Sequence, residues 1–395
     1  MLSVLSVAVF VFLIAAGLLG TQQDQLANVL PAFVWVAWWV GLGFVCALVG
    51  NVWPALNPWA AVPALLPVRL RPRAVRPLPS RMGVWPAVFL YLCFAWAELV
   101  WPNNTAPARL AALILAYSTL TWAAMTCYGV EPWLKCGETF SIIFGLFGRF
   151  APLARTPEGA LVVRHYGSGL ADGGKVPVSM VVLVVTLLAT VSFDGFLHTP
   201  VWAGLYAASS HALYDIGWTR FLGNTGARTL VFTVGLLLAP ACFVALFLGT
   251  CGLMARLENP WRGTRRRALD VASEYVLTLV PIAIAYHLAH YLLLLIVEGQ
   301  LLYGHISDPF GVGWDLFGTA GVTPDPTVVD ARLLWLFSLF VIVAGHVIAV
   351  WLAHRAARRA SGGETAVAPQ IPMLVLMVGY TVFSLWIIGQ PIVEV

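Results

Sequence analysis

Long apolar stretches separated by short polar segments run through the whole chain. A helix needs about 20 consecutive apolar residues to cross a bilayer, and the pattern predicts nine such spans. A tenth apolar piece, 139–147, is too short to cross, and we expect it to lie in the membrane interface. The fold class predicted is therefore all-α, a polytopic transmembrane helical bundle in which residues 1–395 form one integral-membrane domain. The nine spans lie near residues 2–20, 30–50, 84–101, 108–127, 178–193, 228–252, 271–297, 332–352 and 370–390.

Composition agrees with this class, because 60% of the 395 residues are apolar and only 10% are charged. The stretch 2–20 lacks the basic start and the small-residue cleavage site of a secretory signal, so we expect it to remain as a span. The six cysteines form no CxxC pair and predict no disulfide framework.

The basic residues predict how the chain is oriented. Eighteen of the 22 Lys and Arg residues fall in four segments, 51–83, 128–177, 253–270 and the end of the 332–352 span. Lysine and arginine collect in cytoplasmic loops, which predicts a multi-pass protein of the cell (inner) membrane with a cytoplasmic N-terminus and a C-terminus outside. The net charge of +4 is thus a topology signal, and we expect no nucleic-acid partner.

The most informative motif is Tyr286-His287-Leu288-Ala289-His290-Tyr291, which lies inside the apolar stretch 271–297. Two imidazoles three residues apart lie on the same side of a helix. Ionisable groups at membrane depth are expensive unless they face protein, water or a metal. The pair is therefore the first candidate for a functional site.

Other polar residues are expected at a similar height, toward the outer surface. His211 and Asp215 share a face at i, i+4 spacing if 203–216 is a short helix on the membrane. The depth of the other residues follows from the helical rise of 1.5 Å per residue. It places Glu98, Asp194 and His198 at this height too, near the outer ends of their segments.

Imidazole and carboxylate groups together are the usual ligands of first-row metals. We expect a divalent metal, zinc first and copper as the alternative, whose bound water is activated for hydrolysis. The expected metal ligands are His287, His290, His211 and Asp215, and the expected catalytic carboxylates are Asp194 and Glu98.

Each of these residues also has a structural interpretation. An imidazole in a span can donate to a carbonyl one turn away or form a polar bond between helices. The His211–Asp215 pair can be a hydrated interfacial pair, and the Glu98 carboxylate can extend to the nearby surface. His346 lies deeper, in the inner half of its span, where we expect a buried hydrogen bond, with a haem ligand as the alternative.

Several dispersed motifs resemble integral-membrane proteins known as fenitrothion hydrolases. They extend over residues 30–390 and consist of Trp38-Trp39-Val40-Gly41, Asn51-Val52-Trp53-Pro54 with Asn57-Pro58-Trp59, Phe193-Asp194-Gly195, the histidine motif, and Ser307-Asp308-Pro309-Phe310-Gly311 with Gly313-Trp314. The resemblance implies hydrolysis of an organophosphate triester. Proteins of that group begin with a longer outer segment that contains a His-Gly pair. If that segment supplies a ligand there, the resemblance implies that the site of this chain is altered or is completed by a partner.

Three functions follow from these observations. The first is a metal-dependent membrane hydrolase that acts on a phosphotriester or similar ester at the outer half of the bilayer, with a small-molecule substrate. The second is a non-hydrolytic subunit of a membrane redox complex, in which the histidines hold copper or haem beside partner subunits. The third is a transporter whose carboxylates and imidazoles relay protons.

Overall fold

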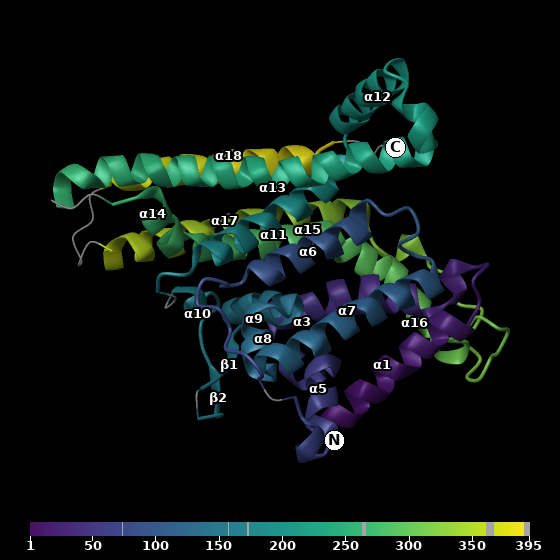
Figure 1. Cartoon of the computed structure of the whole chain (residues 1–395). Coiled ribbons are helices and arrows are strands. Elements are labelled where there is room, and N and C mark those ends of the chain that lie inside the picture. Colours follow the sequence, from purple (N-terminus) through teal and green to yellow (C-terminus); the bar gives the residue numbers. More distant parts are fainter. Residues whose placement is uncertain (73, 157, 172–173, 263–265, 361–366, 391–395) are drawn as a thin grey trace. The chain divides into compact units, whose positions relative to one another are not determined.

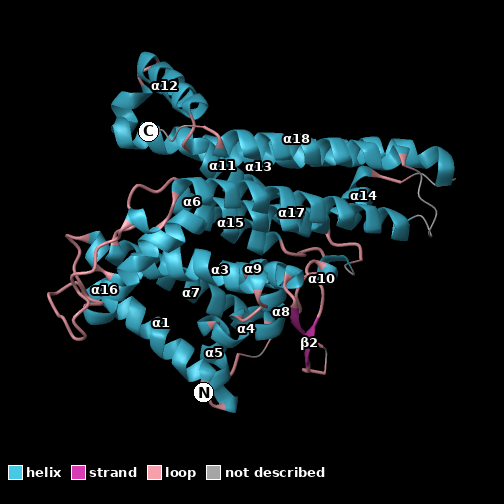
Figure 2. Ribbon diagram, turned by 180° about the vertical axis from the view of Figure 1, so that it is seen from behind, coloured by secondary structure: helices cyan, strands magenta, loops and turns pink. Residues whose placement is uncertain are grey.

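The structure is a computed structural model that describes residues 1–395 except 73, 157, 172–173, 263–265, 361–366 and 391–395. Helices dominate it. In the part of the chain that the structure describes, strands occur only in one antiparallel hairpin, β1 (Leu153–Arg155) with β2 (Leu161–Val163), in which Leu153 pairs with Val163 (Figure 2). The all-α class predicted from the apolar pattern is confirmed.

Eight described helical segments are long and apolar enough to cross a membrane, so the chain is a multi-pass membrane protein. They fall on eight of the nine predicted spans. Their bounds are Leu2–Leu19, Val29–Leu48, Pro107–Tyr128, Val178–Leu197, Trp218–Glu258, Ala268–Ser307, Ala331–Arg359 and Ala368–Ile388.

The ninth prediction, 84–101, corresponds to a shorter helix, α6 (Trp85–Leu99), which has 15 residues. At 1.5 Å per residue its length is about 22 Å, less than the roughly 30 Å of the hydrocarbon core. Pro102 follows it closely and disfavours helical geometry in the residue before it. The apolar run is therefore longer than the helix that forms from it. The predicted short piece 139–147 is also helical, as α9 (Thr139–Phe150).

The chain forms two compact units, each assembled from three separate segments. Unit 1 contains Met1–Ala87, Asn103–Tyr166 and Tyr291–Leu336, and unit 2 contains Val88–Pro102, Gly167–His290 and Phe337–Val395. Three helices contribute residues to both: α6, α15 (Val280–Val297) and α17 (Ala331–Ala360). No single linker separates the units, which explains why the composition along the chain predicts no boundary.

The core of unit 1 forms where α1, α2 and α7 pack together. Leu13, Leu30 and Leu110 are buried there. Asn28 joins two of these helices, because its side chain accepts from Leu30 N at 3.0 Å and donates to the Ala16 carbonyl at 2.9 Å. The helices of unit 1 (Figure 1) are α1 (Leu2–Leu19), η1 (Gln25–Ala27), α2 (Val29–Ala32), the π-helical η2 (Phe33–Leu42), α3 (Gly43–Leu48), α4 (Trp53–Leu56), α5 (Pro58–Leu65), η3 (Val68–Leu70), α7 (Pro107–Tyr128), α8 (Val130–Cys136), α9, η5 (Glu298–Gln300), α16 (Leu301–Ser307) and η6 (Pro326–Val328).

The loop 307–318 of unit 1 is held by hydrogen bonds to a single carboxylate. The Asp308 carboxylate accepts three backbone N–H bonds, from Val312, Gly313 and Trp314, at 3.0, 2.6 and 3.1 Å. A carboxylate that satisfies consecutive backbone donors fixes the path of a turn.

In unit 2, α11 (Val178–Leu197) is the most enclosed of the candidate spans, because nearly all of its residues are buried. α13 and α18 lie side by side in both views (Figures 1 and 2). α13 (Trp218–Arg262) is longer than the predicted span 228–252 and has a kink at Gly223, whose φ of 66° only glycine adopts at little cost. The other elements are α10 (Ser168–Ala171), α12 (Pro200–Asp215), α14 (Ala268–Tyr275), η4 (Val276–Leu279), η7 (Ala368–Gln370) and α18 (Ile371–Ile388).

Candidate functional site

A histidine and a carboxylate from two different helices meet inside unit 2. His290 Nε2 of α15 lies 2.9 Å from Asp194 Oδ2 of α11. The two side chains are only 22% and 11% exposed. An ionised carboxylate only accepts hydrogen bonds, so Nε2 carries the proton and Nδ1 is the basic nitrogen of the neutral ring. The pair thus has the arrangement by which a carboxylate orients an imidazole for proton transfer.

Asp194 also holds a second histidine, through its main chain. His198 is the C-cap residue of α11 and lies one turn after Asp194. Its Nδ1 is 3.0 Å from the Asp194 carbonyl oxygen. The carbonyl can only accept, so the neutral His198 ring carries its proton on Nδ1 and leaves Nε2 as the acceptor nitrogen. The His198 and His290 ring centroids are 6.5 Å apart. His198 is exposed, so this edge of the site is the accessible one.

His287 lies one turn before His290 and is almost fully buried, with 3% of its surface exposed. Both Asp194 and His290 are close enough to His287 to interact with it electrostatically. The Tyr286 ring is stacked on the His290 ring with centroids 6.0 Å apart. The predicted histidine pair therefore faces protein, but its two members have different surroundings.

The Tyr286 hydroxyl reaches α11 because residue 195 is a glycine. A Cβ placed on Gly195 would lie 2.4 Å from Tyr286 Oη. Among the described residues this buried hydroxyl has no hydrogen-bond partner. The Phe193-Asp194-Gly195 motif thus supplies both the carboxylate and the space for the tyrosine beside it.

A second polar group lies between α11, α17 and α18. Ser192 Oγ and Tyr380 Oη share a short hydrogen bond, and the Tyr380 ring is 5.7 Å from the His346 ring. His346 Nδ1 donates to the Ile342 carbonyl at 2.8 Å, which confirms the buried hydrogen bond expected for this residue. Within the described chain, His346 Nε2 is buried and has no partner.

The other residues predicted for the site have different positions. Glu98 is half-buried on α6, and that helix is joined to α11 by the Tyr91–Thr190 hydrogen bond of 2.5 Å. His211 and Asp215 both lie on α12, which confirms the predicted helix, and both are exposed.

These residues do not add up to a preformed metal site. Among the described residues, no group of three or more His, Cys, Asp or Glu lies close enough together to hold a metal ion. The structure thus brings His290 and Asp194 into contact and places His287 and His198 beside them. It does not gather His211 and Asp215 with His287 and His290 into such a group.

Sequence reasoning assigned no role to Tyr286, which stacks on His290, or to Ser192 and Tyr380, which form the second polar group beside His346. The available signal was weak, because a hydroxyl in an apolar helix can bond its own backbone as easily as a neighbouring helix. Tyr286 alone stood in a motif, directly before His287. Cys136, the last residue of α8 in unit 1, is a poor candidate for a nucleophile. Burial raises the pKa of its thiol to about 11 and so keeps the thiol protonated.

Unit 1 contains a separate buried carboxylate that the sequence analysis also missed. Glu138 is fully buried and caps α9, accepting from Phe140 N at 3.1 Å and from Ser141 N at 2.9 Å. Side-chain donors also surround it: Trp53 Nε1 at 3.4 Å, Asn57 Nδ2 at 3.1 Å, Tyr117 Oη at 2.8 Å and Ser141 Oγ.

The aromatic rings around Glu138 are packed closely. Trp38 and Phe140 have centroids 4.5 Å apart, Trp59 and Tyr117 4.9 Å, and Trp53 and Phe144 5.4 Å. With its donors supplied by the protein itself, this carboxylate is a structural cap of unit 1.

Comparison of the sequence with protein-family models, with curated proteins and with solved structures finds no match.

Proposed function

We propose that the protein is a membrane-embedded hydrolase that cleaves a phosphotriester or a similar ester with His290 as the general base. The observation that supports this proposal is the 2.9 Å contact between His290 Nε2 and Asp194 Oδ2. Ionisable groups in apolar helices usually mark a functional site, and a carboxylate-oriented imidazole is the common proton acceptor of hydrolases.

The reaction can be written with these residues. The Asp194 carboxylate accepts a hydrogen bond from the Nε2–H group of His290, so the proton of the neutral ring stays on Nε2 and Nδ1 is unprotonated. Nδ1 takes a proton from water as the water oxygen attacks phosphorus, and the bond from phosphorus to the leaving alkoxide or phenoxide breaks. The proton then passes from His290 to the leaving group or to solvent. Asp194 also stabilises the imidazolium that forms between these steps.

A divalent metal bound by His287 and His290, zinc or copper, remains a prediction. The donor chemistry suits such a metal, but the described residues do not form a three-ligand group. His211, Asp215 and Glu98 would have to approach the histidines to complete one. We therefore assign no step of the reaction to the metal.

The test uses detergent-purified protein and a chromogenic phosphotriester such as fenitrothion. His290→Ala is expected to lower kcat at least 100-fold, since general-base catalysis contributes roughly 10² to 10⁴. His165→Ala is the matched control, because this histidine is exposed and belongs to unit 1. Elemental analysis of both variants and of His287→Ala tests the metal separately. A His290→Ala protein that hydrolyses at the wild-type rate refutes the proposal.

A proton-coupled transporter is the second candidate, and the Ser192–Tyr380–His346 group favours it. A hydrolase that works at Asp194 does not need these buried polar residues, whereas a proton relay through the unit does. Protein reconstituted in vesicles with an internal pH dye distinguishes the two. Loss of proton movement in Tyr380→Phe with hydrolysis unchanged would support transport, and no proton movement in the wild-type protein would exclude it.

A further inference from the structure

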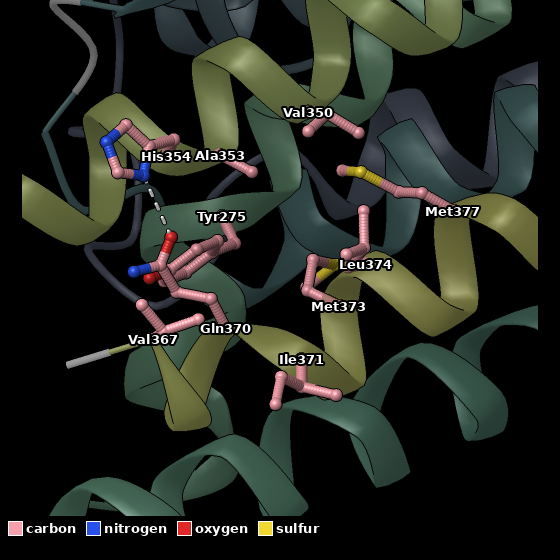
Figure 3. A pocket seen from close by; sticks show the side chains of 10 residues that line it. All are labelled: Tyr275, Val350, Ala353, His354, Val367, Gln370, Ile371, Met373, Leu374 and Met377. Carbon is pink, nitrogen blue, oxygen red and sulfur yellow. Dashed lines mark hydrogen bonds between the residues drawn. The ribbon is translucent and has the colours of Figure 1, made fainter. Parts of the chain in front are cut away.

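The loop 307–318, which follows α16 in unit 1, displays large apolar side chains outward. The exposed fractions are 53% for Val312, 47% for Trp314, 62% for Leu316 and 70% for Phe317. The apolar side chains of α17 and α18 in unit 2 are arranged differently, because they line a cavity of about 220 Å³ (Figure 3). Exposed apolar side chains that gather in one loop indicate an interaction surface.

The backbone of this loop is satisfied by the loop itself. Asp308 accepts the N–H groups of Val312 and Trp314. The Ser307 carbonyl accepts from Leu316 N at 3.3 Å, and Ser307 Oγ accepts from Phe317 N at 3.1 Å. The N–H groups of all four displayed residues therefore have acceptors within the loop. An irregular segment can enter an apolar environment only when its backbone groups are satisfied by protein, and these four N–H groups meet that condition.

A row of aromatic rings joins the loop to α1. The ring centroids of Phe12 and Phe310 are 5.8 Å apart, and those of Phe310 and Trp314 are 5.5 Å apart. Thr21 N, just beyond the end of α1, donates to the Phe310 carbonyl at 2.7 Å. Both views show α16 beside the end of α1 that lies away from the N-terminus (Figures 1 and 2). Phe12 is exposed on a candidate membrane span, so the row begins on a surface that faces lipid and continues into the loop.

The charges of the loop indicate which contacts it can make with a bilayer. Residues 298–331 contain no Lys or Arg, and it is basic residues that attract anionic headgroups. Asp308 is occupied by backbone donors, and Asp315 Oδ1 accepts from Ala320 N at 3.1 Å. Tryptophan is enriched in the layer between headgroups and hydrocarbon. The contact is therefore apolar and does not depend on headgroup charge.

We propose that the loop 307–318 inserts its four displayed side chains into the boundary between headgroups and acyl chains, at the end of α1. The partner is the lipid bilayer, contacted by a surface that lies outside the eight candidate spans. Insertion depends on buried apolar area, so it takes place in zwitterionic bilayers. Asp308 and Ser307 keep the loop folded during insertion. Lipid is favoured over a second copy or a partner protein because the aromatic row starts on a lipid-facing helix.

The test replaces Phe317 of the full chain with a fluorescent amino acid, in phosphatidylcholine nanodiscs that each hold one copy. Brominated lipid quenches the label from within the bilayer, and iodide quenches it from water. The label is expected to be quenched by brominated lipid and protected from iodide. Its emission should be shifted to shorter wavelength relative to the same label in place of Thr323, which is exposed in the same segment. Nanodiscs of phosphatidylglycerol should give the same result.

A second pair of variants tests whether the folded loop is what inserts. Asp308→Ala removes the acceptor of three backbone N–H groups, so the label at 317 should lose its protection and reach the level of the label at 323. Asp325→Ala removes an exposed carboxylate that caps η6. It is the matched control and should leave the protection unchanged.

Four outcomes overturn the proposal. Iodide access at position 317 in single-copy nanodiscs would leave the surface to a partner protein. Protection only in vesicles crowded with protein would assign it to a second copy. Retained protection in Asp308→Ala, or insertion only in phosphatidylglycerol, would contradict the folded apolar loop. The label reports its surroundings whether or not the protein cleaves an ester, so the proposed hydrolase can fail without affecting this result.

Discussion

Replacing Glu138 with alanine should strongly destabilise unit 1. The change removes the cap of α9, which costs about 1 kcal/mol. It also leaves the buried donors of Trp53 and Tyr117 without their acceptor, at about 1–3 kcal/mol each. Asn57 and Ser141 lose less, because Asn57 Nδ2 also donates to Ser141 Oγ at 3.1 Å. The expected loss in the free energy of unfolding is therefore about 3 to 7 kcal/mol.

The assay is denaturant unfolding in detergent micelles, followed by tryptophan fluorescence. Glu138→Gln keeps the volume of the side chain but turns an NH₂ group toward donors, so its stability should fall between wild type and Glu138→Ala. Glu131→Ala is the control. It removes an exposed carboxylate from the neighbouring helix, and the ion pair with Lys135 has side chains 78% and 83% exposed, worth less than about 1 kcal/mol. If Glu138→Ala unfolds within about 1 kcal/mol of this control, the cap assignment is wrong.

Two further predictions concern the site in unit 2. Asp194→Asn preserves the shape of the contact but offers an NH₂ group or a weaker acceptor to His290. The rate of hydrolysis should therefore fall at least 100-fold, while the midpoint of unfolding changes little. A variant with the wild-type kcat would show that the carboxylate has no catalytic role. Gly195→Ala forces its new methyl group against Tyr286 Oη at 2.4 Å, and overpacking should cost about 1–3 kcal/mol. Gly379→Ala, in a helix with nothing within 4 Å of the added carbon, should instead stabilise by up to about 1 kcal/mol. Equal melting temperatures for these two glycine variants would contradict the close approach of Tyr286.

The apolar pattern predicted the helices well because each span is defined by local composition alone. The ends of the helices were predicted less well than their positions. The apolar run at 84–101 continues past the point where α6 stops at Leu99, and the 228–252 run lies inside a helix that continues to Arg262. The division into two units could not be predicted, since it depends on which distant segments pack together.

The estimate of depth along the spans placed seven residues at a similar height: Glu98, Asp194, His198, His211, Asp215, His287 and His290. The structure brings four of them together, namely Asp194, His198, His287 and His290. The rise of 1.5 Å per residue is the same in every helix, so this estimate needs no knowledge of neighbours. Which helices are neighbours is a different question. The contact between His290 and Asp194 requires α15 and α11 to be adjacent, with both side chains turned toward each other, and no spacing within either segment contains that information.

The same reasoning explains why Glu138 was missed while the histidine motif was found. The histidines stand out in an apolar run, where any polar residue has to be explained. Glu138 lies in a polar segment beside Glu131 and Lys135, where a carboxylate is ordinary. Its burial becomes apparent only when donors from α4, α7 and the Asn57 turn converge on it. A sequence reveals a buried charge where its surroundings along the chain are apolar, and conceals one whose apolar surroundings are assembled by folding.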